Sequence, residues 1–382
     1  MSQFLPNNQI ALLKNGEEFF PALEAEIDRA EYEIHLQTYI FEHDDTGKKI
    51  ADALMRASAR KVTVNLLLDG FGSKDFPASL LESLQTAGVN VLFFRPKISP
   101  WTLKRNRLRR LHRKVSVFDG HVAFVGGINI IDDFDVPKDK TSPRIDYAVR
   151  IEGPLLAPIM QHVHTLWART AWSQLKPATI STHQLDQPAT GDKLAAFIVR
   201  DNLRHRRDIE NAYLAAIENA KSEILIANAY FMPGRRFRRV LMRAAERGVR
   251  VRLLLQGRME YFLMVATHAF YSIFLQAGIE IYEYRKSFMH AKVAVIDDDW
   301  VTVGSSNIDP FSLLLAREAN VVVLDKAFAQ TLKQDLEKVI AAGATQILWD
   351  DWSRGFILKR AISWVVYGLV RFVLGVIGQP RR

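Results

Sequence analysis

Two segments of the chain, 178 residues apart, carry the same pattern of polar residues and glycine. The first is LHRKVSVFDGHVAFVGGINI (111–130) and the second is MHAKVAVIDDDWVTVGSSNI (289–308). The aligned pairs are His112 with His290, Lys114 with Lys292, Asp119 with Asp297, Gly126 with Gly304 and Asn129 with Asn307. On a strand, residues two apart point to the same face, so each histidine lies beside its lysine. A single histidine on an apolar strand usually packs in the core, but the repeat of a whole His-x-Lys pattern favours a catalytic role.

A pocket built from both copies would attract an anion, and a phosphate diester is the obvious small one. Imidazole performs nucleophilic and proton-transfer chemistry near neutral pH. One histidine could attack phosphorus to form a phosphohistidine, while the other protonates the departing alcohol and later deprotonates the acceptor. The two lysines, with the amides of Asn129 and Asn307, could hold the non-bridging oxygens. The pattern therefore predicts a two-step phosphodiester exchange.

The chain supplies positive charge at this pocket through lysine, which does not ligate a metal while it is protonated. Neither motif carries a cluster of carboxylates, and the chain has no cysteine for a thiolate site. We therefore expect no metal ion and no cofactor in the reaction.

The aspartates and glycines of the motifs suit roles in the backbone. Asp119 and Asp297 follow their lysines by five residues and stand at DG and DD turns, so we expect them to accept hydrogen bonds at the turn or from a catalytic ring. Gly126, Gly127 and Gly304 would permit a close backbone approach near the phosphate.

The repeat extends beyond the motifs to a whole domain. AEYEIHLQTYIF (30–41) resembles AKSEILIANAYF (220–231), and each is followed by an apolar helix pattern and a strand. Alternating strands and helices predict two tandem α/β/α domains, each a mixed sheet flanked by helices, related by a pseudo-twofold axis. We place the first domain at 1–172, a linker rich in Pro, Thr and Gln at 173–193, and the second domain at 194–345.

The segment 346–382 differs from both domains and is predicted to be a tail that associates with a membrane. Its part 356–378 is mostly apolar, but Arg360, Ser363, Tyr367 and Arg371 fall at helical spacing on one stripe. A charge near a bilayer centre costs at least about 2.5 kcal/mol, which favours a helix lying in the interface. The alternative is a helix packed on the protein core or on a partner.

Net charge is +9, which favours polyanionic partners such as an anionic membrane or nucleic acid. KRNRLRRLHRK (104–114) interleaves basic and apolar residues just before His112, as expected for docking on anionic lipid. A second basic run, from Arg235 to Arg247, fits a solvated helix face as well as phosphate contact. The N-terminus lacks a cleaved leader pattern. The eight histidines outside the motifs lack such a repeat, and we expect surface or packing roles for them.

The paired patterns, HxKxxxxD with GGxN and HxKxxxxD with GSSN, resemble the signature of the phospholipase D superfamily. DYAVRIEGP (146–154), ANAYFMPG (227–234) and REANVVV (317–323) extend the resemblance, within the superfamily, to bacterial cardiolipin synthases of the short B type. The resemblance implies a catalytic set of His112, Lys114, Asp119, His290, Lys292 and Asp297. It also implies that His112 is the nucleophile and that His290 is the general acid and then the base.

The activity implied by the resemblance is phosphatidyl transfer from one phosphatidylglycerol to another, with release of glycerol. The expected partner is an anionic phospholipid membrane containing phosphatidylglycerol, with the protein bound peripherally on the cytoplasmic side of a bacterial cell membrane. Nucleic acid is an unlikely substrate because the basic run has few aromatic residues for stacking. The alternatives are a phosphodiesterase that hydrolyses phospholipid or nucleic acid and, more remotely, an inactive membrane-binding module.

Overall fold

The computed structural model describes residues 3–96, 109–135, 142–180, 188–201, 204–258, 262–309 and 316–354, together with residues 312, 363, 365, 366 and 368. Most of the predicted tail helix at 356–378 therefore lies outside the described residues, as does the first part of the basic run, 104–108. In the part of the chain that the structure describes, no helix has both the length and the apolar composition needed to cross a membrane.

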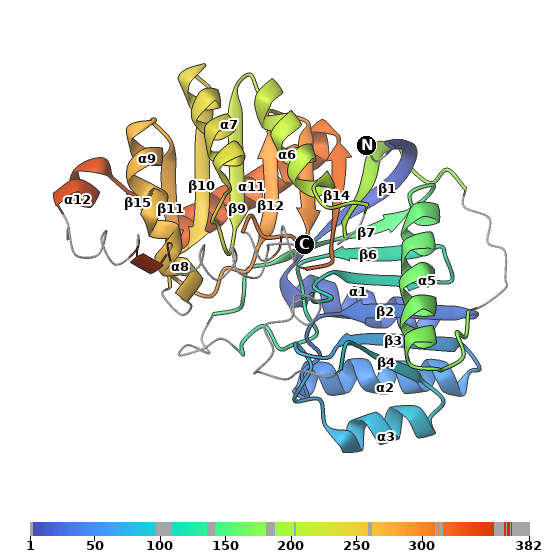
Figure 1. Ribbon diagram of the computed structural model, residues 1–382. Coiled ribbons are helices and arrows are strands. Elements are labelled where there is room, and N and C mark those ends of the chain that lie inside the picture. Colours follow the sequence, from blue (N-terminus) through green and yellow to red (C-terminus); the bar gives the residue numbers. More distant parts are fainter. Residues whose placement is uncertain are drawn as a thin grey trace, which may run out of the picture.

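Each half of the chain folds into a mixed sheet with helices on both faces, as predicted (Figure 1). The first half contains β1 (Leu5–Lys14), α1 (Asn15–Arg29), β2 (Glu33–Thr38), α2 (Asp45–Ala59), β3 (Thr63–Asp69), α3 (Ala78–Thr86), β4 (Asn90–Phe94), β5 (Lys114–Phe118), β6 (Val122–Gly126), β7 (Tyr147–Glu152) and α5 (Leu156–Ser173). The strands are short and rich in β-branched residues, as in KVSVF of β5, which suits a buried pleated surface.

The second half repeats this order and adds elements at its end. It contains β8 (Lys193–Arg200), α6 (Asp208–Asn219), β9 (Glu223–Asn228), α7 (Arg235–Glu246), β10 (Arg250–Gln256), α8 (Phe262–Thr267), a 3₁₀ turn (His268–Phe270), α9 (Tyr271–Gln276), β11 (Glu280–Tyr284), β12 (Lys292–Ile296), β13 (Trp300–Gly304), β14 (Glu318–Leu324), α11 (Lys326–Gly343), β15 (Ala344–Ile347) and α12 (Trp349–Arg354). The domain boundaries given above stay a prediction.

The strands of both halves join into one sheet of 15 strands. The first half has the order β1-β7-β6-β5-β2-β3-β4, and the second has the matching order β8-β14-β13-β12-β9-β10-β11, with β15 at the edge. The halves meet where β1 pairs antiparallel with β8. The matching orders on either side of this seam express the predicted pseudo-twofold relationship.

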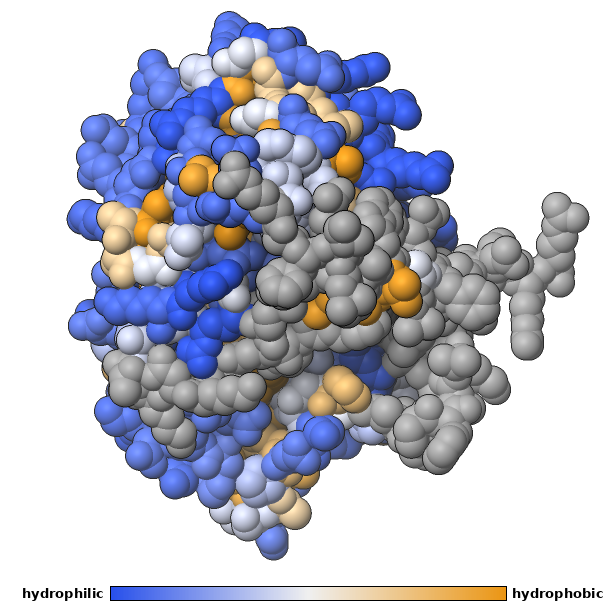
Figure 2. Space-filling model, turned by 90° about the vertical axis from the view of Figure 1, so that its left-hand side faces the viewer, coloured by the Kyte–Doolittle hydropathy of each residue, from blue (hydrophilic) through white to orange (hydrophobic). Residues whose placement is uncertain are grey.

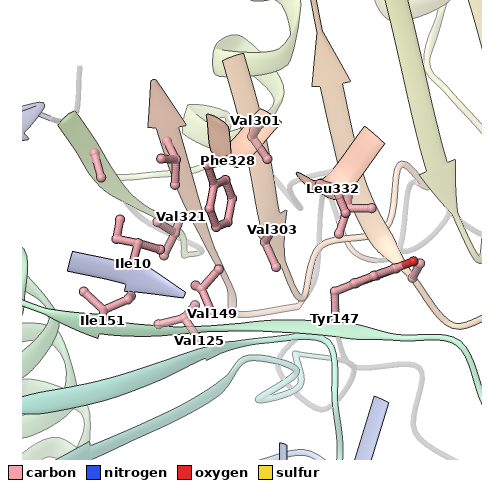
Figure 3. Packing of buried hydrophobic residues seen from close by; sticks show 14 of the residues in the cluster. Ile10, Val125, Tyr147, Val149, Ile151, Val301, Val303, Val321, Phe328 and Leu332 are labelled. Atoms are coloured by element: carbon pink, nitrogen blue, oxygen red, sulfur yellow. The ribbon is translucent and has the colours of Figure 1, made fainter. Parts of the chain in front are cut away.

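The largest hydrophobic core lies between the halves and contains side chains from both. Ile10 and Val149 of the first half and Val303, Val321 and Phe328 of the second belong to one buried cluster (Figure 3). Helices α5 and α11 contribute to this cluster, whereas α1 with α2, and α6 with α7, cover the opposite face of each sheet. This shared core fixes the halves against each other, which sets the geometry of any site formed between them.

Candidate functional site

The segments that carry the two histidines are anchored to the opposite half of the molecule. The backbone N–H of His112 donates to the carbonyl of Arg317 at 3.0 Å, just before β14. The backbone N–H of His290 donates in the same way to the carbonyl of Ile145 at 2.7 Å, just before β7. Parallel bridges from Leu111 to Arg317 and from Ile145 to Met289 accompany these bonds. Both motifs are thus brought to the same seam between the halves.

Each imidazole is paired with a carboxylate that also comes from the opposite half. Nδ1 of His112 lies 3.0 Å from the carboxylate of Glu318, and Nδ1 of His290 lies 2.6 Å from Oδ2 of Asp146. With an ionised carboxylate at Nδ1, the proton resides on that nitrogen and Nε2 keeps its lone pair. Both histidines are therefore oriented to use Nε2 for attack on phosphorus or for proton transfer.

Each motif lysine is the first residue of its strand, β5 or β12, and its side chain bonds to the backbone of the histidine two residues earlier. Nζ of Lys114 donates to the carbonyl of His112 at 2.7 Å, and Nζ of Lys292 donates to the carbonyl of His290. Both side chains are buried, and Nζ of Lys292 also lies 3.8 Å from Asp146. Burial and the mutual repulsion of the two ammonium groups lower the pKa of Lys114 to about 7, and burial lowers the pKa of Lys292 to about 8.

The pKa values of the two imidazoles depend on charged groups from both halves of the molecule. Burial and the charge of Lys292 lower the pKa of His290 to about 3, against the opposing effect of Asp146. Burial also lowers the pKa of His112, where Lys114 and Lys292 oppose protonation and Glu318 favours it. Burial raises the pKa of Asp146, but Lys292 and His290 more than offset this effect and bring it below the ordinary value. The histidine and lysine side chains of the two motifs thus influence one another's protonation. An anion bound among them would stabilise their positively charged forms.

The motif aspartates are not brought to this unit. Asp119 follows β5 directly, so five residues of extended chain, about 16 Å at the usual rise per residue, separate it from Lys114. Its carboxylate accepts from the backbone N–H groups of Glu31, Tyr32 and Glu33 at 2.7–2.8 Å. Asp119 has a positive φ of 49° at its turn, a conformation that aspartate tolerates better than most residues.

Asp297 repeats this arrangement in the second half. Its φ is 53°, and its carboxylate accepts from the N–H groups of Lys221, Ser222 and Glu223. These bonds outweigh the effect of partial burial and lower its pKa. Both aspartates thus tie the hairpin turn of a motif to the start of β2 or β9.

The motif asparagines lie just past the ends of β6 and β13. The side-chain oxygen of Asn129 accepts from the N–H of Ile40 at 3.2 Å, and that of Asn307 is buried without a hydrogen-bond partner among the described residues. The glycines approach protein groups closely. A Cβ on Gly127 would lie 2.2 Å from Oδ1 of Asp146, so this glycine makes room for the carboxylate behind His290.

Glu318 and Asp146 are the members of this candidate site that were not predicted from the sequence. Each stands immediately before or at the start of the strand that follows its motif, β14 or β7. Asp146 and Glu318 are 172 residues apart, whereas the motifs are 178 apart, because Asp146 follows Gly126 by 20 residues and Glu318 follows Gly304 by only 14. A second alignment that allowed this gap would have paired them.

Some described residues of the two basic runs form an ion pair or lie on a solvent-exposed helix face. Arg110 lies 3.5 Å from the buried carboxylate of Asp69. On α7, the buried residues are apolar and Arg235, Arg236, Arg239 and Arg243 are exposed, which fits a solvated helix face. Figure 2 shows one side of the molecule as mostly hydrophilic, with its coloured hydrophobic residues in small groups.

Comparison with known proteins gives a consistent result. Residues 23–134 and 213–340 match the family described as cardiolipin synthase, PLD-like domain. Cardiolipin synthase B of Salmonella typhimurium is 41% identical over 350 residues, covering 89% of this chain and 82% of the relative. Cardiolipin synthase B of Escherichia coli K12 is 39% identical over 342 residues, with the same coverage.

Among solved structures, phosphatidylserine synthase of Haemophilus influenzae superposes with a TM-score of 0.72. The match covers 97% of this chain and 95% of that one at 14% identity, so it supports the fold. The chain belongs to the cardiolipin synthase family with PLD-like domains.

Proposed function

We propose that this family member is a cardiolipin synthase that moves a phosphatidyl group from one phosphatidylglycerol to the hydroxyl of a second, with release of glycerol. Relatives named cardiolipin synthase B support this activity. The observation that carries the mechanism is the pair of imidazoles, each bonded at Nδ1 to a carboxylate of the opposite half. This arrangement suits one nucleophile and one acid-base group acting on the same phosphorus.

In the first step, Nε2 of His112 attacks the phosphorus of the donor lipid. The P–N bond forms as the bond from phosphorus to the glycerol headgroup oxygen breaks, and His290 gives that oxygen its proton. Asp146 and the phosphate anion both favour a protonated His290 in the complex, which offsets the effect of burial. The assignment of attack to His112 follows the superfamily resemblance.

In the second step, His290 accepts the proton of a hydroxyl on the second phosphatidylglycerol. The resulting oxygen nucleophile attacks phosphorus and the P–N bond to His112 breaks, so the phosphate diester is restored. Lys114 and Lys292, with donors from Asn129 and Asn307, hold the non-bridging oxygens. Because the lysines supply this positive charge, we propose that the reaction needs no metal ion.

We also propose that the protein acts as a peripheral protein at an anionic phospholipid membrane, on the cytoplasmic side. Its net charge of +9 supports attraction to such a surface. The names of the relatives imply a lipid product, which requires access to lipid.

The test is lipid conversion by the purified full chain in phosphatidylglycerol vesicles with EDTA present. The wild type should produce cardiolipin and free glycerol in equal amounts. Neither His112→Ala nor His290→Ala should produce them. Phosphatidic acid without cardiolipin would identify a hydrolase instead. Activity that disappears with EDTA and returns with a divalent cation would reject the metal-free mechanism, and absence of any lipid turnover would reject the proposal.

A further inference from the structure

A second cationic site adjoins the segment that carries His112, but its lining includes neither motif histidine and neither motif lysine. A cavity of about 460 Å³ is bounded by α5, the end of β8 and the residue before β14. Its lining includes five arginines and a single carboxylate; the arginines are Arg113, Arg169, Arg200, Arg204 and Arg317. His162 and His205 also line it. The cavity thus concentrates positive charge well beyond what its one acidic residue, Asp201, can balance.

The arginines at the floor of the cavity are held by neutral groups. Arg113 is 4% exposed and donates to the side-chain oxygen of Gln37 and to the carbonyl of His162. Arg200 is 3% exposed and donates to the carbonyl of Ala316, while its Nε is buried without a hydrogen-bond partner among the described residues. A buried guanidinium with a free donor is costly unless a ligand supplies an acceptor.

The carboxylate of the cavity is already engaged. Asp201 accepts from the backbone N–H groups of Arg204 and His205 at 2.9 and 3.0 Å. The imidazole of His205 is bonded to Asp208 on α6 at 2.7 Å. The charge of Asp201 favours the ionised forms of Arg200 and Arg317, and that of Glu318 favours ionised Arg200. Among the described residues, however, neither carboxylate lies within salt-bridge distance of the arginines that line the cavity.

The electrostatics agree with this geometry. Burial and the charge of Arg317 lower the pKa of Arg113 to about 9, and burial lowers the pKa of Arg200 to about 10. Burial, with the charge of Arg113, lowers the pKa of His162 to about 4. An anion in the cavity would oppose every one of these shifts, because it favours the protonated forms.

The cavity is separate from the catalytic pair but connected to it through the backbone. Arg113 stands between His112 and Lys114, and Arg317 precedes Glu318. Both arginines line the cavity, whereas His112, Lys114 and Glu318 do not. The carbonyl of Arg317 accepts from the N–H groups of both His112 and Arg113. An anion held by Arg113 and Arg317 would therefore steady the segments that position His112 and Glu318.

We propose that this cavity binds a phosphate group, as a second anion site distinct from the one between the two histidines. Guanidinium groups are well suited to phosphate because their planar donors engage two oxygens at once. The phosphate could belong to a phospholipid headgroup or be free inorganic phosphate, and the chemistry of recognition is the same. The inference does not depend on the proposed activity, because binding can be measured without turnover.

The experiment is calorimetric titration of the full chain with two probes. Inorganic phosphate is titrated into the wild type, and dihexanoyl-phosphatidylglycerol below its micelle concentration is titrated into His290→Ala, which should not turn it over. The cavity variant is Arg169→Gln/Arg204→Gln, because both side chains are exposed at the rim and their replacement should leave the fold intact. The matched control, Arg207→Gln/Arg236→Gln, removes two exposed arginines that do not line the cavity.

We expect the affinity of one binding event to fall at least tenfold in the cavity variant and to stay unchanged in the control. Arg204→Gln alone should lower this affinity to an intermediate degree. If the cavity variant binds inorganic phosphate more weakly than the wild type does, free phosphate is a sufficient ligand. If only its affinity for the lipid falls, the ligand is a phospholipid headgroup. Equal affinities in cavity and control variants for both probes would overturn the proposal, as would absence of binding by either probe. Thermal melts of all variants confirm that weakened binding does not reflect unfolding.

Discussion

The two halves of the molecule build the same histidine–carboxylate pair from different parts. Glu318, behind His112, also accepts from the hydroxyl of Ser305 at 2.6 Å. Asp146, behind His290, is one methylene shorter, has Gly127 at the position of Ser305, and lies 3.8 Å from Lys292. The ring neighbours differ as well, since Tyr39 lies tilted beside His112 and Phe288 is stacked on His290. The two halves thus share the histidine–carboxylate contact but differ in the groups around it, which suits the two different roles proposed above for the histidines.

The largest expected effect separates the roles of the two histidines. With phosphatidylglycerol, both His112→Ala and His290→Ala should lower kcat by about 10³-fold or more. With phosphatidyl-p-nitrophenol the leaving group needs no acid, so His290→Ala should release a burst of p-nitrophenol and His112→Ala should not. A burst from His112→Ala alone would reverse the assignment of the nucleophile.

The next effect concerns the carboxylates. Glu318→Gln and Asp146→Asn should each lower kcat by about 10²- to 10⁴-fold, because the imidazole loses the partner that fixes its tautomer. The loss should be larger for Asp146→Asn, since Lys292 then also lacks its counter-charge. Asp335→Asn is the control, because this carboxylate bonds Tyr147 and Lys14 instead of an imidazole. Equal kcat values for the control and for the two test variants would show that Glu318 and Asp146 do not orient the imidazoles.

Gly127 and Ser305 occupy equivalent positions in the two halves, and we expect their exchange to lower kcat by unequal amounts. Gly127→Ser places a Cβ 2.2 Å from Asp146 and should lower kcat by about 10²-fold, as expected for a displaced orienting group. Ser305→Gly removes one hydrogen bond to Glu318 and should cost about tenfold. Steady-state kinetics of both variants check the prediction, and a larger loss for Ser305→Gly would contradict it.

The pH dependence should distinguish the lysines. Because the pKa of Lys114 is lowered to about 7 and that of Lys292 to about 8, raising the pH deprotonates them in the free enzyme. Therefore kcat/KM should fall by about tenfold or more between pH 7 and 9. Lys114→Arg keeps its charge and should move the start of this fall to higher pH, whereas an unchanged profile would exclude Lys114 as its source.

The smallest effect on catalysis is expected for the motif aspartates. Asp119→Asn and Asp297→Asn should each lower the free energy of unfolding by about 1–3 kcal/mol, through weaker bonds to backbone N–H groups. The loss should be greater for Asp119, which is 8% exposed. Denaturant unfolding measures this change, and kcat per folded molecule should stay near the wild-type value. A loss of kcat comparable to that of the histidine variants would give them a chemical role.

The sequence predicted those features that are repeated without a gap. The two α/β halves follow from the alternation of strand and helix patterns and from a constant offset of 178 residues between the motifs. The pairing of Asp146 with His290 across the halves depends on the β1–β8 seam and the bridges beside it, which no local pattern encodes. The arginine cavity was missed for the same reason, since its lining comes from segments around residues 113, 165, 202 and 317.

The crossing of the two histidine–carboxylate pairs has a consequence for synthesis of the protein. A nascent first half carries His112 without Glu318, and the carbonyl that anchors His112 is made some 200 residues later. Long-range contacts of this kind form late in folding. The two histidine–carboxylate pairs are therefore complete only once the second half has been synthesised and has docked on the first.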